Sequence, residues 1–463
     1  MADIALPASV PMIERLVAFD TTSRHSNLPM IEFIAGWLER RGVTVTLCRN
    51  GTGDKANLIA EFGPREAPAI IVSGHSDVVP ADGQNWQITP PFTPRRHRSR
   101  LYGRGTADMK GFVGVALTRL TAWHQRHRSR HGVILALSFD EEVGCQGAPL
   151  MLPVLARQRE RLRGVIIGEP TEMRVATAHK GHVGLRAVLN GVGGHSGYPE
   201  HGINAIDLAA DVLLDLRQLA KEKRQQALHD VRFDPPWSTV HVGTIHGGTV
   251  LNRIPERCEM DIEMRCLPNQ RVEELREYLQ RLYPPSAVGD PLESGTDASR
   301  PPGCLRTGSH YTGSHDTDSY DTSSHSMASL PRACASLPKE PPSPTGSATV
   351  ATQAGRTQRG SLTLESLGHY PALDERRREF PRWIADLAGS PAQPMALGFG
   401  CEAGLFAQLG APTVICGPGS IHQAHRPDEY ITFEQVIQCE QFFTRLLAAL
   451  AFPIPGSAEA ECT

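Results

Sequence analysis

Acidic and histidine residues recur directly after short apolar runs of the chain. They are His75 and Asp77 after the run 67–73, Asp140, Glu141 and Glu142 after the run 132–139, and Glu169 after the run 164–168. Two further candidates are Asp108, in Gly103-Arg-Gly-Thr-Ala-Asp-Met-Lys-Gly111, and His425, in the glycine-rich loop that begins at Gly417. Three consecutive acids repel one another, and their crowding favours a bound cation.

Each of these residues also has a structural explanation when it is taken alone. His75 could be a packed histidine, Asp108 a helix N-cap, Glu169 a turn residue, and His422 a residue of a surface loop. Together, however, two histidines and three carboxylates make the mixed nitrogen and oxygen ligand set of a two-zinc hydrolytic site. Such a metal pair shares a bridging carboxylate, and a spare carboxylate must move a proton from water to the leaving amine.

The order of the predicted elements explains why these side chains should meet. Helical spacing over 11–19, 30–41, 111–123 and 147–158 alternates with buried strands over 67–73, 132–139 and 164–168. This alternation indicates an α/β sheet that is covered on both faces, and sites in such sheets form at the carboxyl ends of the strands.

The pattern changes from about residue 181. Strand, helix, strand, strand and helix are predicted over 183–189, 202–223, 238–245, 258–265 and 271–282, and the run 361–367 supplies one more strand. This order predicts a smaller α+β, ferredoxin-like domain inserted into the first. We therefore expect a first domain over 1–178 and 371–463, and a second domain over 179–370.

A long polar tract interrupts the second domain. Pro284–Gln358 is rich in Ser, Pro, Thr and Gly and cannot bury enough apolar surface to offset its ordering entropy, so disorder is the leading prediction. The echoes Thr307-Gly-Ser-His310, Thr312-Gly-Ser-His315 and Thr322-Ser-Ser-His325 leave a histidine-based metal tract open. A shifted reading frame or a recent insertion is the third interpretation.

Composition excludes several classes of protein. The 463 residues carry 47 Lys and Arg against 50 Asp and Glu, so no chain-wide basic field exists to hold nucleic acid or an anionic membrane. The basic stretches 95–100 and 123–131 are interpreted as solvated loops and a helix end.

No run approaches the ~18 apolar residues of a membrane span, and the N-terminus lacks a signal-peptide pattern. We expect a soluble, cytoplasmic protein with a small-molecule substrate.

The motifs resemble those of the M20 family of co-catalytic zinc peptidases and deacylases. The resemblance rests on His75-Ser-Asp77-Val-Val-Pro, Gly105-Thr-Ala-Asp108-Met-Lys-Gly, Asp140-Glu-Glu-Val-Gly and Gly168-Glu-Pro-Thr, and it covers nearly everything outside 284–358. Within the family, Leu16–Asn27, Lys55-Ala-Asn57-Leu, Ala178-His-Lys-Gly-His182 and Gly417–Tyr430 are most similar to acetylornithine deacetylases. The resemblance implies a two-domain zinc-peptidase fold, with a mixed-sheet catalytic domain and an inserted lid or dimerisation domain.

The resemblance also implies a role for each matching residue. The ligands of two ions, zinc or alternatively cobalt or manganese, would be His75 and Glu169 for one, Glu142 and His425 for the other, and Asp108 as the bridge. Glu141 would be the general base and later acid, and Asp77 would orient His75. Because these residues lie outside 284–358, we expect metal binding to survive the tract.

In the inserted domain the resemblance implies a homodimer. His195, in Gly193-Gly-His-Ser196, would reach into the site of the partner subunit and stabilise the developing oxyanion. Asn252 and Arg265 would contact the substrate carboxylate, and an arginine fork also suits a carboxylate on chemical grounds. The loop glycines Gly417 and Gly419 would line the same substrate site.

The expected reaction is metal-assisted hydrolysis of N2-acetyl-L-ornithine to L-ornithine and acetate, in arginine biosynthesis. Metal ligands do not encode the acyl group, so removal of succinyl from diaminopimelate and cleavage of a dipeptide stay open. Outside the enzymes, the alternative is a non-catalytic metal-binding relative whose lid domain the tract has disrupted.

Overall fold

The computed structural model describes residues 6–125, 129–226, 229–284, 349–351, 357–452 and 454, without the side chains of 349–351 and 357–359. Most of the predicted disordered tract therefore lies outside the described residues. Near its end, β14 (Thr349–Ala351) and β15 (Thr357–Arg359) pair antiparallel. The disorder of 284–358 stays a prediction. Thr and Val in these short runs favour extended backbone.

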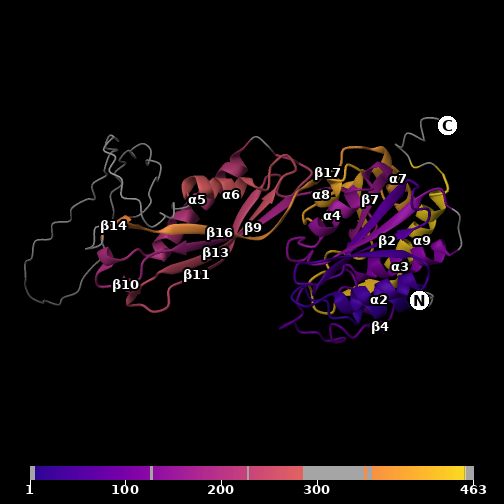
Figure 1. Cartoon of the computed structure of the whole chain (residues 1–463), viewed down its shortest axis with the longest axis horizontal. Helices are drawn as coiled ribbons and strands as arrows, with labels where there is room; N and C mark the ends of the chain where they lie inside the picture. The colour runs from indigo at the N-terminus through magenta and orange to yellow at the C-terminus, as the bar shows by residue number, and fades with distance from the viewer. Residues whose placement is uncertain are drawn as a thin grey trace, which may run out of the picture. The chain divides into compact units, whose positions relative to one another are not determined.

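A nine-stranded mixed sheet is the largest sheet in the described part of the chain, and Figure 1 shows it among its covering helices. Its order is β1-β2-β6-β3-β7-β19-β8-β17, with β18 beside β8. The strands are β1 (Thr44–Arg49), β2 (Ala56–Phe62), β3 (Ala69–His75), β6 (Gly132–Ser138), β7 (Leu162–Pro170), β8 (Ala176–His179), β17 (Leu373–Asp374), β18 (Met395–Leu397) and β19 (Thr413–Gly417). The neighbours β6, β3, β7 and β19 run parallel, so their carboxyl ends share one edge.

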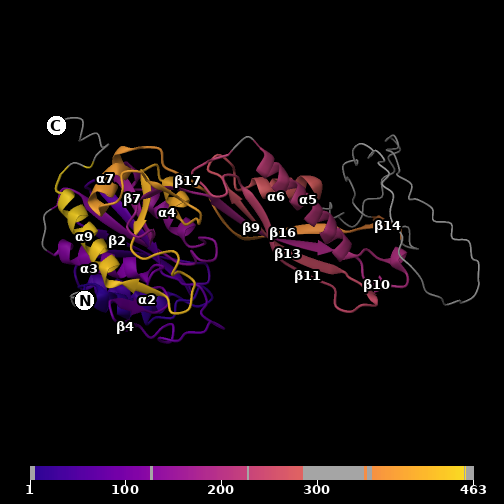
Figure 2. The same cartoon turned by 180° about the vertical axis from the view of Figure 1, so that it is seen from behind.

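Helices cover both faces of this sheet, as the sequence predicted. One face packs against α1 (Val10–Val17), α2 (Leu28–Glu39), α3 (Lys110–His124), α7 (Glu379–Ala388) and α9 (Phe433–Ala449), and the other against α4 (Ala148–Ala156) and α8 (Ala403–Ala407). Side chains alternate along β3, where Val72 joins the first cluster and Ile71 the second. Figures 1 and 2 both show α3 and α9 side by side.

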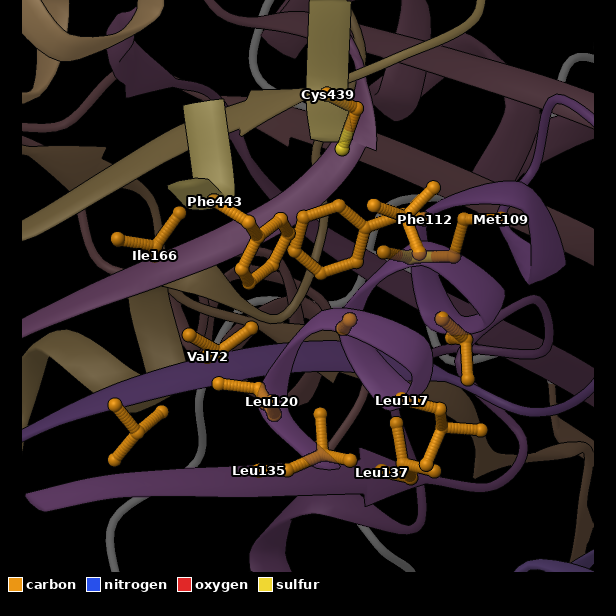
Figure 3. Packing of buried hydrophobic residues seen from close by; sticks show 14 of the residues in the cluster. Val72, Met109, Phe112, Leu117, Leu120, Leu135, Leu137, Ile166, Cys439 and Phe443 are labelled. Atoms are coloured by element: carbon orange, nitrogen blue, oxygen red, sulfur yellow. The ribbon is translucent and has the colours of Figure 1, made fainter. Parts of the chain in front are cut away.

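Packing of helix α3 fixes the start of this helix, which closely follows Asp108 in the chain. Its Phe112 packs on Phe443 of α9 with ring centroids 5.7 Å apart, and Figure 3 shows it beside Met109 in the same cluster. Glycine is required at position 168 of β7, because a Cβ there would lie 2.1 Å from the Phe112 ring. Since α3 begins two residues after Asp108, this packing determines where the Asp108 carboxylate lies.

A second, four-stranded antiparallel sheet has the order β11-β13-β9-β16. Along the chain its elements are β9 (Gly181–Asn190), α5 (Ala205–Gln225), β11 (Thr239–Gly247), β13 (Arg257–Cys266), α6 (Glu274–Leu282) and β16 (Ser361–Tyr370). Alternate residues of β9 and β13 pack against α5 and α6, and the opposite face carries charged pairs such as Arg186 and Asp261. The predicted β-α-β-β-α-β order and the two-domain α/β fold class are confirmed.

The remaining elements are short. β4 (Arg95–His97), β5 (Arg100–Tyr102) and β20 (Tyr430–Thr432) form a three-stranded sheet, and β10 (Gly194–His195) pairs with β12 (Arg253–Ile254). Single helical turns cover Arg159–Arg161 and Pro199–His201. Within the described ranges, no helix combines the length and the apolar character needed to cross a membrane.

Candidate metal centre

Parallel strands bring the predicted ligands to one edge of the large sheet. His75 ends β3, Glu169 is the penultimate residue of β7, Glu142 follows β6, His425 follows β19, and Asp108 precedes α3. These five residues form two groups that share Asp108, and the ligand atoms within each group lie within 4.8 Å of one another. The groups are His75 with Asp108 and Glu169, and Asp108 with Glu142 and His425.

The Asp108 carboxylate faces both histidines. Its Oδ1 lies 3.0 Å from His75 Nε2, and its Oδ2 lies 3.5 Å from His425 Nε2. Each histidine also faces a second carboxylate. His75 Nε2 is 4.0 Å from Glu169 Oε1, and His425 Nε2 is 3.0 Å from Glu142 Oε2. One carboxylate between two groups of donors is the arrangement expected of a bridging metal ligand.

The clustered carboxylates control the charge of both histidines. Burial opposes protonation of His75, but its hydrogen bond to Asp108 and the charges of Asp108 and Glu169 raise its pKa well above the usual range. Hydrogen bonds to Asp108 and Glu142 raise the pKa of His425 to about 10, against the effect of burial. The same carboxylates that favour protonated histidines in the absence of a metal would favour bound cations.

The acids of the cluster compete with one another for ionisation. Burial, followed by the charges of Asp108 and Glu141, raises the pKa of Glu169 well above that of a free carboxyl. Burial and the charge of Asp108 raise the pKa of Glu142, and burial and the neighbouring acids also raise that of Glu141, which the charge of His75 opposes. Four carboxylates in one enclosed place require compensating positive charge.

Two orphaned oxygens test whether metal ions fit here. Glu142 Oε1 and Glu169 Oε1 are buried and have no hydrogen-bond partner among the described residues. Buried carboxylate oxygens are normally paired or bound to metal. Two divalent cations would balance the charges of Asp108, Glu141, Glu142 and Glu169, so the residues present fit a dinuclear centre of nitrogen and oxygen donors.

Asp77 was expected to orient His75 through its carboxylate, and the geometry differs in detail. The short contact joins His75 Nδ1 to the backbone carbonyl of Asp77 at 2.9 Å, whereas Asp77 Oδ1 lies 3.7 Å from Nδ1. The carboxylate instead accepts hydrogen bonds from the amides of Glu141 and Glu142, at 3.1 and 3.3 Å, and from the Ser23 hydroxyl at 2.7 Å. Asp77 therefore connects β3 to the turn that carries Glu141 and Glu142.

Glu429 was not among the predicted site residues, yet it holds the loop of Asp108. It is fully buried, and its Oε1 accepts hydrogen bonds from the amides of Ala107 and Asp108. Its Oε2 accepts from the amide of Gly105 and from the buried Arg104 guanidinium at 2.8 Å. The sequence signal was present in His425-Arg-Pro-Asp-Glu429, but a surface-loop interpretation of this acid was equally open.

The predicted residues of the second domain fall into two separate places. His195 is exposed on β10, opposite Arg253 of β12, and the adjacent Ser196 amide donates to the Asn252 carbonyl at 3.2 Å. Arg265 lies at the other end of β13, eight residues beyond its first residue Arg257, or roughly 27 Å along an extended strand. One chain thus does not bring Asn252 and Arg265 together.

Arg265 is already engaged on two sides. Its Nη1 donates to the Tyr370 hydroxyl at 3.0 Å, and its Nη2 lies 2.6 Å from Glu263 Oε1. His182 lies 3.1 Å from the same Glu263 oxygen and stacks on the Tyr370 ring. The open two-pronged fork expected for a substrate carboxylate is therefore not free, and Tyr370 and Glu263 are neighbours that the sequence did not indicate.

Gly417 and Gly419 have a backbone reason for being glycine. A Cβ at Gly417 would lie 2.0 Å from the Gly168 carbonyl oxygen, because β19 and β7 approach closely there. Gly419 has φ +85°, which side-chain-bearing residues rarely adopt, and it lies against Ala107. Both glycines shape the loop that leads from β19 to His425.

Known proteins are similar to this chain in sequence over almost its whole length. An acetylornithine deacetylase of Pasteurella multocida is 29% identical over 454 residues, which cover 96% of this chain and 98% of the relative. An acetylornithine deacetylase of Myxococcus xanthus is 30% identical over 448 residues, which cover 96% and 97%. The expected resemblance to these enzymes is confirmed at the level of sequence.

Solved structures show the same fold at lower identity. An M20 family metallo-carboxypeptidase of Sulfolobus solfataricus superimposes with a TM-score of 0.62 at 15% identity, over 96% of this chain and 99% of that one. A dinuclear metal-binding peptidase of the M20 family from Bacillus subtilis gives 0.56 at 13% identity, over 96% and 97%. A sequence profile described as peptidase family M20/M25/M40 matches residues 71–449. The chain therefore belongs to peptidase family M20/M25/M40 and is a hydrolase of that family.

Proposed function

We propose that this protein is a metal-dependent deacylase that hydrolyses N2-acetyl-L-ornithine to L-ornithine and acetate. The observation that carries the proposal is the Asp108 carboxylate placed between His75 and His425, with Glu169 and Glu142 beside them. Relatives of nearly full length that are named acetylornithine deacetylase support the choice of substrate. Arginine biosynthesis and a cytoplasmic location are parts of this proposal and rest on the sequence.

The five donors would hold two ions, and zinc is our first choice because imidazole and carboxylate donors are typical of catalytic zinc sites. Cobalt or manganese also suit such donors. When bound, the ions supply positive charge that polarises the scissile carbonyl and makes water more acidic. The remaining work of proton transfer and orientation belongs to side chains of the protein.

Glu141 is the proposed general base and acid. It neighbours the ligand Glu142 on the turn after β6, yet it belongs to neither group of donors, so its carboxylate is available for proton transfer. Glu141 takes a proton from the water that attacks the acetyl carbonyl, and it returns a proton to the amine nitrogen as the C–N bond breaks. The Cys145 thiol donates to Glu141 Oε1 at 3.5 Å and limits where that oxygen can lie.

His195 is proposed to stabilise the oxyanion from a second subunit. Its Nδ1 accepts a hydrogen bond from the Gly197 amide at 3.0 Å, which leaves Nε2 to carry the proton and act as a donor. His195 and Asn252 lie at the end of the four-stranded sheet away from Gly181 and Tyr370, where the chain leaves for the large sheet. A homodimer in which each subunit completes the site of the other explains both positions.

The test is product release from purified protein after chelation and after return of Zn²⁺ or Co²⁺. The panel contains N2-acetyl-L-ornithine, N-succinyl-diaminopimelate and a dipeptide, with Glu141→Gln as the inactive control. Metal-restored release of ornithine, and little activity on the other two, is the expected result. Preference for another compound would overturn the substrate assignment, and two bound ions without any turnover would favour the non-catalytic alternative.

A further inference from the structure

The turn that carries the proposed base begins in an uncommon backbone conformation. Asp140, the first residue after Phe139, has φ +53°, a left-handed value that few residues other than glycine, asparagine and aspartate adopt. Glu141 and Glu142 follow directly, so a change of conformation at Asp140 would move both carboxylates. Contacts from outside the turn can favour one conformation.

Lys55 is placed to do so. Its Nζ lies 2.6 Å from both carboxylate oxygens of Asp140, and the two side chains are only 12% and 11% exposed. The ladder between β2 and β6 pairs Leu58 with Leu137, and continuing this register places Lys55 opposite Asp140. An ion pair shielded from water and made with both oxygens fixes the direction of the Asp140 side chain.

The Lys55 ammonium also connects to the opposite side of the turn. It donates to the backbone carbonyl of Ser23, whose hydroxyl donates to Asp77 Oδ2 at 2.7 Å. The Asp77 carboxylate in turn accepts the amides of Glu141 and Glu142. Hydrogen bonds thus connect Lys55, Ser23 and Asp77 to both sides of the turn, at Asp140 and at the amides of Glu141 and Glu142.

Asn57 closes the base of the same turn. It is fully buried, its Oδ1 accepts the Phe139 amide at 3.1 Å, and its Nδ2 donates to the Gly147 carbonyl at 2.8 Å. Phe139 and Gly147 also bond to each other through their backbones. Lys55 directly precedes β2 and Asn57 is its second residue. The start of β2 therefore holds Asp140 through Lys55, and it holds the two ends of the segment 139–147 through Asn57.

We propose that Lys55 is a positioning residue that holds the turn 140–142 in the conformation in which Glu141 acts, and that Asn57 fixes the two ends of the longer segment 139–147 that contains this turn. The proposal rests on the proposed function only for the role of Glu141. It explains why Asp140, although it stands in a run of three acids, belongs to neither group of metal donors. Its carboxylate serves Lys55 instead.

The experiment compares Lys55→Met, the double variant Lys55→Met with Asp140→Asn, and Lys221→Met as a matched control on the exposed face of α5. Each holoenzyme is assayed for kcat and KM at saturating Zn²⁺. Hydrogen exchange of the segment 139–147 is measured in the same samples. We expect Lys55→Met to lower kcat about 10- to 100-fold with little change in KM, and to speed exchange at Glu141 and Glu142.

The double variant separates positioning from simple charge neutralisation, and it remains informative if Lys55→Met folds poorly, since it buries no unpaired charge. If Lys55 positions the turn, kcat stays low in the double variant and exchange stays fast. Wild-type kcat in the double variant, or unchanged exchange in both variants, would overturn the proposal. If the wild-type protein hydrolyses no N-acyl amino acid, the proposed function fails, while the exchange result still decides whether Lys55 holds the turn.

Discussion

Glu429 accepts a hydrogen bond from the backbone amide of Asp108 at 3.2 Å, although 321 residues separate them in the chain. The same carboxylate binds two more amides of the Asp108 loop and the buried Arg104 guanidinium. The position of the Asp108 carboxylate thus depends on an acid that belongs to neither group of donors. The segment after β19 therefore supplies both His425, a candidate ligand, and Glu429, which supports another candidate ligand.

Glu429→Gln should weaken both the fold and the metal centre. The amide keeps the size of the side chain but leaves the buried Arg104 without its charge partner, a change that costs about 3–5 kcal/mol of unfolding free energy. Loosening the Asp108 loop should lower metal affinity about 10- to 100-fold. Urea unfolding and calorimetric Zn²⁺ titration measure the two effects. The exposed Glu434→Gln is the control, and wild-type metal affinity in Glu429→Gln would contradict this role.

Glu141→Gln and Glu142→Gln form a matched pair, because the two residues are adjacent but only Glu142 belongs to a group of donors. Glu141→Gln should keep about two metal ions per chain and lose about 10²- to 10⁴-fold in kcat, since the proton carrier is removed. Glu142→Gln should lose one ion at low metal concentration. Metal analysis after dialysis, combined with steady-state kinetics, distinguishes them. Substantial kcat in Glu141→Gln would exclude its assigned role.

Three of the candidate positions could be found from sequence because they follow strands with a clear pattern. The runs before His75, Asp140 and Glu169 are short and almost entirely apolar, which is the signal of a strand buried on both faces. Parallel strands place their ends at one edge, so assembly of the ligands followed from the order of elements. The inserted β-α-β-β-α-β domain could be predicted for the same reason.

The supporting residues could not be found in this way. Ser23, Lys55 and Glu429 act on the turn and loop of the site from distant parts of the chain, and no periodicity in their own segments indicates a partner. Edge strand β1 was missed because three of the six residues of Thr44–Arg49 are polar or charged and none of its side chains is fully buried. Arg265 showed the right chemistry for a carboxylate, but only the structure showed that Glu263 and Tyr370 already occupy its guanidinium.

Mixing two inactive variants tests whether His195 acts across a dimer. Glu141→Gln lacks the proposed base, and His195→Ala lacks the proposed oxyanion donor. A dimer with one chain of each kind contains one site with both residues intact, so the purified mixed dimer should show about half of wild-type kcat, and an unseparated random mixture about a quarter. Co-expression of the two chains with different tags, followed by tandem purification, supplies the mixed dimer. Absence of restored activity in a verified mixed dimer would contradict the crossed site.

The buried His179 should make the metal-free fold less stable in acid. Burial lowers the pKa of His179 to about 4, although its hydrogen bond to the Lys180 carbonyl opposes this effect. In the unfolded chain its pKa is about 6.5. Between these values the unfolded state binds a proton that the folded state does not, so stability falls as pH decreases from 6.5 to 4 and this contribution is complete below 4. The full effect is about 3 kcal/mol.

His179→Asn isolates this contribution, because the Asn amide can keep the hydrogen bond to the Lys180 carbonyl but does not titrate. The variant should be less stable than wild type at pH 7.5, since the ring contact with Tyr370 is lost. The difference should shrink by about 3 kcal/mol as pH falls to 4, because only the wild type carries the penalty. Urea unfolding in EDTA at several pH values measures it, and the other histidines cancel in the comparison. A difference that stays constant with pH would show that folding does not lower the pKa of His179.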